Sequence, residues 1–186
     1  MSLERPVEIK KEKLDEIDFS DYLNIKEDEK QKLKEWLEIR EELPDYFWDN
    51  IKDISPDKNL RYIILNIKKE LDSIYKNKKT NITSLSVSRF ISLNNALNEG
   101  MYSCGIATKI YGTCFRKFNI PVKFIHGKID SKKVLHSWLE IYDPRNKNWF
   151  DFDSTKNDFK LSNEARKINT YHDWEEMKDD FYKGNM

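Results

Sequence analysis

The run Gly100-Met101-Tyr102-Ser103-Cys104-Gly105-Ile106-Ala107 begins the segment on which the fold depends. Ser103 is a residue type that commonly caps a helix N-terminus, and apolar residues recur after it with the period of a helix. The residues on this stripe are Ala107, Ile110, Tyr111, Cys114 and Phe118. A stripe this wide predicts a helix packed within a core, with the Cys104 thiol at its N-terminus.

Cys104 has two interpretations. At a helix N-terminus the unpaired N–H groups and the helix dipole favour the thiolate over the thiol, which is what a nucleophilic cysteine needs. A free cysteine is also among the most buried residue types, and most free cysteines only pack. The thiol by itself therefore leaves both interpretations open.

Composition limits the classes of protein to consider. The chain has 186 residues, which suits one domain, and its hydrophobic content of 38% is enough for a core. It carries 33 basic and 33 acidic residues, so its net charge is zero. A general nucleic-acid binder usually has a basic excess. We therefore expect no nucleic-acid partner.

The cysteines and the termini bear on the cellular compartment. Cys104 and Cys114 would lie about 15 Å apart along one helix, too far for a disulfide. Two unpaired thiols favour a reducing compartment. The N-terminus is charged from Glu4 onward and lacks the apolar segment of a signal peptide, and no apolar run is long enough to span a bilayer. The sequence predicts a cytoplasmic protein with no membrane partner.

The first half of the chain is predicted to be mainly helical. Residues 1–25 are polar with scattered apolar anchors and are interpreted as an arm over the surface. A helix is expected from Glu27 until Pro44 stops it. A second helix begins at Ser55-Pro56-Asp57, with proline near the first turn, and a third ends at Gly100. We assign residues 1–55 to an N-terminal helical extension.

The second half changes to the period of strands. The segments predicted as strands are 122–127, 134–142 and 149–152. Residues 143–146 have turn chemistry, and the tail is expected to contain a short helix carrying Trp174, Met177 and Phe181. Helices followed by antiparallel strands indicate an α+β fold. Residues 56–186 would form the core, within one compact domain overall.

The predicted hairpin brings further groups into consideration. If residues 143–146 form a four-residue loop, His136 lies directly opposite Asp153, with Cβ atoms about 5 Å apart. Asp151 would oppose His136 only with a two-residue Asp-Pro loop, and proline cannot adopt the positive φ that a type I′ turn needs. The predicted register therefore favours Asp153 over Asp151.

Cys104, His136 and Asp153 then form a possible catalytic set. Asp153 would orient the imidazole, His136 would take the thiol proton, and Cys104 would attack an acyl carbon. The alternative keeps Cys104 as packing, His136 as a half-buried strand residue and Asp153 as a turn residue. Spacing alone does not decide between the two.

Three blocks of residues resemble the transglutaminase-like superfamily. They are Gly100-x-x-x-Cys104-Gly105-x-Ala107; Arg116-x-x-x-Ile120-Pro121-x-Lys123 with Gly127; and His136-x-Trp138-x-Glu140-x-Tyr142 with Trp149-x-x-x-Asp153-Ser154-Thr155. The resemblance spans about residues 85–155. It implies a papain-like core with the cysteine on the central helix and the histidine and aspartate on the sheet. It also implies that Cys104 is the nucleophile, His136 the general base and acid, and Asp153 the orienting carboxylate.

The chain departs from the family pattern at three places. Asn119 stands where the family often has glycine, Lys123 where it often has arginine, and Ser154 where it often has proline. None of these changes removes a reacting group. The oxyanion hole is less complete, because only the Cys104 backbone N–H is placed by motif. Candidates for a second donor are Gln31, Trp48, Asn94, Asn95 and Tyr102.

The remaining polar and aromatic residues have simpler interpretations. Trp138 and Tyr102 are candidate substrate contacts, although Trp138 is also well explained by packing. Glu140 would pair with a lysine or line the cleft. His126 and His172 are expected to be structural. The histidines and cysteines have no metal-ligand spacing, and no acidic loop warrants calcium, so we expect neither metal nor organic cofactor.

The function expected from sequence is a thiol-dependent amide-bond hydrolase or acyltransferase. It would act on a protein or peptide through a Cys104 thioester, and its acceptor would be water or an amine. The alternative is a catalytically idle domain of the same fold that binds a protein or peptide. The sequence leaves the oligomeric state open.

Overall fold

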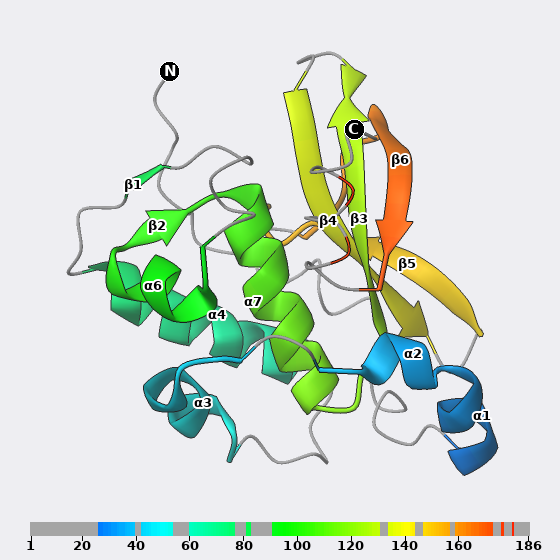
Figure 1. The fold of residues 1–186 in the computed structure, drawn as a ribbon, viewed down its shortest axis with the longest axis horizontal. Helices are drawn as coiled ribbons and strands as arrows, with labels where there is room; N and C mark the ends of the chain where they lie inside the picture. Colours follow the sequence, from blue (N-terminus) through cyan, green and yellow to red (C-terminus); the bar gives the residue numbers. More distant parts are fainter. Residues whose placement is uncertain are drawn as a thin grey trace.

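The computed structural model describes residues 26–39, 42–53, 60–76, 81–82, 91–130, 134–143, 147–156, 159–172, 176 and 180. Its elements are α1 (Glu27–Lys32), α2 (Lys34–Leu37), α3 (Asp45–Ile51), α4 (Leu60–Lys76), β1 (Asn81–Ile82), α6 (Leu93–Asn98), β2 (Met101–Tyr102), α7 (Cys104–Lys117), β3 (Val122–Ile129), β4 (Val134–Asp143), β5 (Asn148–Phe152) and β6 (Ala165–Tyr171). The strands β5-β4-β3-β6 form one antiparallel sheet, and α7 packs between it and the helices α4 and α6 (Figure 1). The α+β fold is confirmed.

Helix α7 is the centre of this arrangement. The Ser103 side chain accepts the backbone N–H of Ile106, so the predicted N-cap is confirmed. Residues 105–116 are all buried, rather than only the predicted apolar stripe. The reason is that the sheet is not the only element packed against α7, because α4 and α6 contact it too. The helix therefore presents its N-terminal end, and not one of its sides, to groups outside the core.

Gly112 allows α7 to lie close against the sheet. A Cβ atom at this position would be 2.5 Å from Cζ of Phe124 on β3 and 3.3 Å from Cδ2 of Leu139 on β4. The first distance is far inside van der Waals contact, so only glycine fits without displacing the ring. Phe124 and Leu139 belong to the same buried cluster as Ile110 of the helix.

Arg116 connects three segments that are distant in sequence. Its guanidinium donates to the carbonyl oxygens of Glu38 (2.6 Å), Val122 (3.0 Å) and His172, and it lies over the Phe124 ring. The side chain is buried. Backbone carbonyls from both ends of the described chain thus depend on one cation for their hydrogen bonds.

Several predictions about the elements were wrong. The helix predicted from Glu27 to Pro44 is interrupted at Leu33, where φ is −102° and ψ is 8°, and it ends at Leu37. Pro44 instead caps the start of α3. The tail contains the strand β6, which the sequence analysis missed. The β6 residues are mostly polar because it is an edge strand, and a bulge opposite His126 and Gly127 disrupts its alternation.

Other predictions fall outside the described residues. They are the arm at 1–25, the helix start at 55–57 with the boundary between residues 55 and 56, most of the turn at 143–146, and the tail positions Trp174, Met177 and Phe181. These stay predictions. Among the helices that are described, none combines the length and the apolar character needed to cross a bilayer.

Candidate active site

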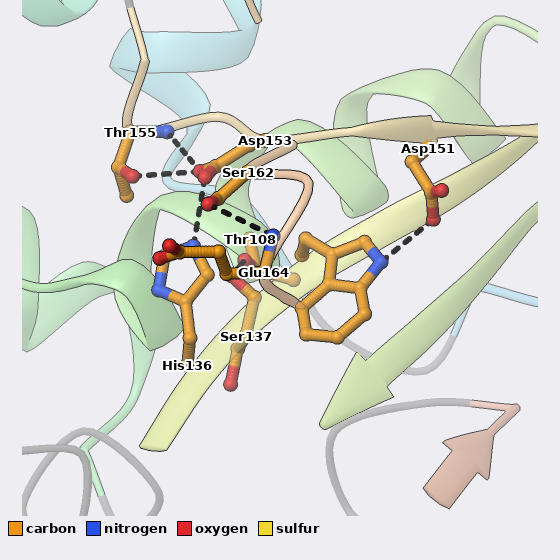
Figure 2. A network of polar contacts seen from close by, with 9 residues as sticks. Thr108, His136, Ser137, Asp151, Asp153, Thr155, Ser162 and Glu164 are labelled. Carbon is orange, nitrogen blue, oxygen red and sulfur yellow. Dashed lines mark hydrogen bonds and ion pairs between the residues drawn. The ribbon is translucent and has the colours of Figure 1, made fainter. Parts of the chain in front are cut away.

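His136 and Asp153 form a buried pair at the end of the sheet. His136 lies near the start of β4, and its Nε2 is 2.8 Å from Oδ2 of Asp153, which directly follows β5 (Figure 2). The second oxygen, Oδ1, accepts the Thr155 backbone N–H (3.0 Å) and hydroxyl (2.6 Å). Both carboxylate oxygens are therefore held, and the side chain has one orientation towards the imidazole.

The register that predicted this pair was wrong by two residues. Tyr142 lies opposite Trp149, so the connection between β4 and β5 is residues 144–147 rather than 143–146. Continued past β5, this register would place Asp153 opposite Trp138 and diagonal to His136. The two still meet, because they share a face of the sheet and the chain turns immediately after Asp153. The preference for Asp153 over Asp151 as the partner of His136 is confirmed.

Cys104 lies on the other side of His136. The Cys104 thiol interacts with the imidazole, and this interaction is one of the causes that raise the pKa of His136. Cys104 is partly exposed and not in a disulfide. One turn into α7, the Thr108 hydroxyl donates to the carbonyl oxygen of Ser137 (3.1 Å), the residue after His136. This bond fixes the first turn of α7 against β4, and so places the thiol beside the imidazole.

The electrostatics of the site favour a charged imidazole. Burial by itself would lower the pKa of His136, but hydrogen bonds to Asp153 and Cys104 outweigh it and raise the pKa to about 9. Burial would likewise raise the pKa of Asp153, yet the bonds from His136 and Thr155 hold it below its usual value. At neutral pH the pair is an imidazolium and a carboxylate.

Among the candidate oxyanion donors, Tyr102 interacts electrostatically with both Asp153 and Cys104. Burial, followed by electrostatic interaction with Asp153 and Cys104, raises the pKa of Tyr102 to about 12, so the phenol keeps its proton at neutral pH. Its ring stands edge-on to Tyr75, at 5.6 Å between centroids. Trp48 instead packs on Phe118, just past the C-terminal end of α7, which excludes it as a donor to a substrate at Cys104.

Trp138 is buried beside the pair. Its side chain is only 1% exposed, which favours the packing interpretation over a substrate contact. The indole Nε1 donates to Oδ1 of Asp151 (2.8 Å), and the ring stacks on His136 at 6.1 Å between centroids. Asp151, the rejected partner of His136, therefore binds the indole next to it.

The other singled-out residues lie away from Cys104. Glu140 pairs with Lys123 (3.6 Å) and with Lys167, which confirms the lysine interpretation. His172 stacks on Trp36 and makes ion-pair contacts with Glu35 (3.3 Å) and Glu176 (3.0 Å), as a structural residue would. His126 is buried on β3. Among the residues that the structure describes, no three His, Cys, Asp or Glu side chains are grouped to hold a metal ion.

Comparisons with known proteins add little. No family model matches the chain, and no curated protein matches it. The chain resembles a 1.9 Å crystal structure named "Putative Cysteine Protease from Cytophaga hutchinsonii", with 21% sequence identity and a TM-score of 0.47. The similarity covers 89% of this chain and 52% of that one, so the chain spans about half of its length. These values are too low to assign a family.

Proposed function

We propose that the chain is a thiol-dependent enzyme of the transglutaminase-like superfamily, with a papain-like core, that acts on amide bonds of a protein or peptide. The observation that carries the proposal is the imidazole of His136 between Asp153 Oδ2, at 2.8 Å, and the Cys104 thiol. A nucleophile, a base and a group that orients the base are the parts that covalent acyl transfer requires.

The positions of the atoms suggest each proton transfer. Because Nε2 of His136 is bonded to Asp153, Nδ1 is the ring nitrogen left for Cys104. With His136 as the imidazolium, Nδ1 already carries the proton taken from the thiol, and Sγ adds to the carbonyl carbon as the thiolate. Nδ1–H then protonates the leaving nitrogen as the C–N bond breaks, which leaves a thioester on Cys104. Water or an amine, deprotonated by the imidazole, attacks the thioester and regenerates the thiol.

The tetrahedral intermediate needs hydrogen-bond donors for its oxyanion. The backbone N–H of Cys104, at the N-terminus of α7, would supply one, and the protonated phenol of Tyr102 is our choice for the second. Tyr102→Phe should then lower turnover of a labelled peptide mixture by about 100-fold while leaving Cys104 alkylation unchanged. If Tyr102→Phe lowered peptide turnover and Cys104 alkylation equally, Tyr102 would support the thiol and would not be an oxyanion donor.

Thiol alkylation tests the proposal before any substrate is known. Iodoacetamide labelling is followed by mass spectrometry from pH 5 to 9, and the buried Cys114 is the internal control. An ordinary thiol, with a pKa of about 8.5, is less than about 1% thiolate at pH 6. We expect Cys104 to react at pH 6 about 100-fold faster in the wild type than in His136→Ala. His172→Gln, which removes a histidine far from Cys104, is the matched control and should react as the wild type does.

The opposite outcome would favour the idle domain. If Cys104 alkylates as an ordinary thiol, or equally with and without His136, the chain lacks the activated nucleophile. Peptide binding by the wild type would then be the activity to measure. If Cys104 is activated, adding an amine to the peptide assay separates transfer from hydrolysis by the mass of the product.

A further inference from the structure

Trp138 lies on the same face of the sheet as the proposed catalytic pair. Directly paired residues share a face, and β4 pairs Gly127 with His136 and Asp151 with Glu140. Figure 2 shows Asp151, whose Oδ1 accepts the Trp138 N–H, on one side of the network and the Asp153–Thr155 contacts on the other. Asp153 therefore contacts His136 directly, and Asp151 contacts the tryptophan that stacks on it.

Gly127 determines where the indole lies. A Cβ atom at this position would overlap Cη2 and Cζ3 of Trp138, and also the carbonyl oxygen of Arg166 on the neighbouring β6. The six-membered ring of the indole thus rests on the bare backbone of β3, where any other residue would push it away. This contact prevents movement of the ring towards β3.

Asp151 fixes the opposite end of the same ring system. Its Oδ1 accepts the indole N–H at 2.8 Å, and a hydrogen bond to a carboxylate is stronger than one between neutral groups. Gly127 contacts the six-membered ring of the indole and Asp151 accepts its N–H. The indole therefore stays at an interplanar angle of 24° to the His136 ring. The imidazole consequently has a fixed aromatic surface along its face as well as Asp153 in its plane.

We infer that Asp151 is a positioning residue for His136 that acts through the indole of Trp138. An anion that accepts the indole N–H increases electron density in the ring, and an electron-rich ring face attracts a cation such as imidazolium. Asp151 thereby stabilises the charged form of His136 without touching it. This inference deepens the proposed function and rests on it for its catalytic meaning.

The titration of His136 tests the inference directly. We would follow the His136 ring by NMR in a Cys104→Ala chain, so that the thiol does not contribute. Asp151→Asn and Trp138→Phe should each lower the proton-binding constant of His136 by roughly threefold to tenfold, as expected for weakening a desolvated cation–π contact. Asp130→Asn is the matched control, because it removes a carboxylate that pairs with Arg166 on the same sheet. It should leave the constant unchanged.

The double variant shows whether Asp151 acts through Trp138. Phenylalanine has no N–H, so adding Asp151→Asn to Trp138→Phe should lower the constant no further. If Asp151→Asn lowered the proton-binding constant of His136 equally with and without Trp138→Phe, the Asp151 charge would act directly, and the inference would be overturned. An unchanged proton-binding constant of His136 in Asp151→Asn would also overturn the inference. This substitution keeps the size of the side chain and its Oδ1 acceptor.

The two proposals fail in different experiments. The titration is made without the Cys104 thiol, so its result does not depend on whether that thiol is activated. Ordinary alkylation of Cys104 in the intact chain removes the proposed function and leaves the titration valid. Activated Cys104 together with an unchanged titration in Asp151→Asn removes only the inference.

Discussion

The two ends of α7 carry the two cysteines of the chain in opposite environments. Cys104, in the first turn, is partly exposed and is one of the groups that raise the pKa of His136. Cys114, in the last turns, is fully buried, and burial raises the pKa of its thiol well above the usual value. The same residue type on one helix therefore lies beside a titrating imidazole at one end and is kept neutral by burial at the other.

The difference lies in what surrounds each end. The N-terminal turn has helix N–H groups, an imidazole and access to water, so a proton can move. The C-terminal turns are enclosed by the core, and the buried charge there, Arg116, donates to backbone carbonyls of three segments. We therefore expect changes at the C-terminal end to affect stability and changes at the N-terminal end to affect chemistry.

Arg116→Met should have the largest effect. It removes the donor to three backbone carbonyl oxygens, of which that of Val122 belongs to a buried residue, and we expect the free energy of unfolding to fall by about 3 kcal/mol. For a chain of this size that lowers the Tm by roughly 10 °C. Below the transition, the alkylation profile of Cys104 should be unchanged.

Lys117→Met is the control for the lost charge. Lys117 is the next residue on α7, and its ammonium lies over the Trp48 ring at 4.7 Å. The free energy of unfolding, measured by thermal unfolding, should change by no more than about 1 kcal/mol in this variant. If Arg116→Met altered Cys104 reactivity while the protein remained folded, the separation between the two ends would be wrong.

Asp153→Asn should have the next largest effect, and it should depend on pH. The raised pKa of His136 contributes stability that is complete below 6.5 and is lost as the pH rises towards about 9. The lowered pKa of Asp153 contributes stability that is complete above 3.8 and is lost as the pH falls through its folded value. The variant should therefore be least stable relative to the wild type between about pH 4 and 6.5, by about 2 kcal/mol.

Urea unfolding across pH 4–9 measures this difference. The difference in the free energy of unfolding between Asp153→Asn and the wild type, called the gap below, should narrow as the pH rises from 6.5 to 9. A gap that stays constant over the whole range would mean that the His136–Asp153 pair is not charged in the folded protein.

Thr108→Val should have the smallest effect on stability, about 1 kcal/mol, because one buried hydrogen bond to Ser137 is lost. Since this bond holds the first turn of α7 against β4, Cys104 alkylation at pH 6 should fall severalfold. Thr108→Ser keeps the hydroxyl and should restore the wild-type rate. Equal alkylation rates in all three proteins would show that the core alone positions α7.

Local sequence signals predicted much of this site. Ser103 as the cap and the helix after it follow from the preference of serine for N-caps and from apolar spacing. The strands β3, β4 and β5 follow from β-branched and aromatic runs. The hydrogen bonds from Thr155 to Asp153 also had a signal in the sequence. Thr155 lies two positions after Asp153, and this spacing lets the aspartate side chain accept a backbone N–H.

Other contacts carried no local signal. The pairing of His136 with Asp153 was predicted through a register that proved wrong by two residues, because the loop between β4 and β5 could not be located from its residues alone. The strand β6 was missed because its edge position allows polar residues. The Thr108–Ser137 and Trp138–Asp151 bonds join elements whose spacing in the sequence says nothing about their distance in space.

By itself, the sequence determined the element types, the capped helix with Cys104 at its start, and a sheet that includes His136. Those features depend on interactions between residues a few positions apart. The tertiary structure alone decided how Asp153 reaches the imidazole, which carboxylate holds the indole, and that residues 105–116 of α7 are all buried. These depend on register, on the turn after β5 and on how closely α7 approaches the sheet, and each is set by packing across the whole core.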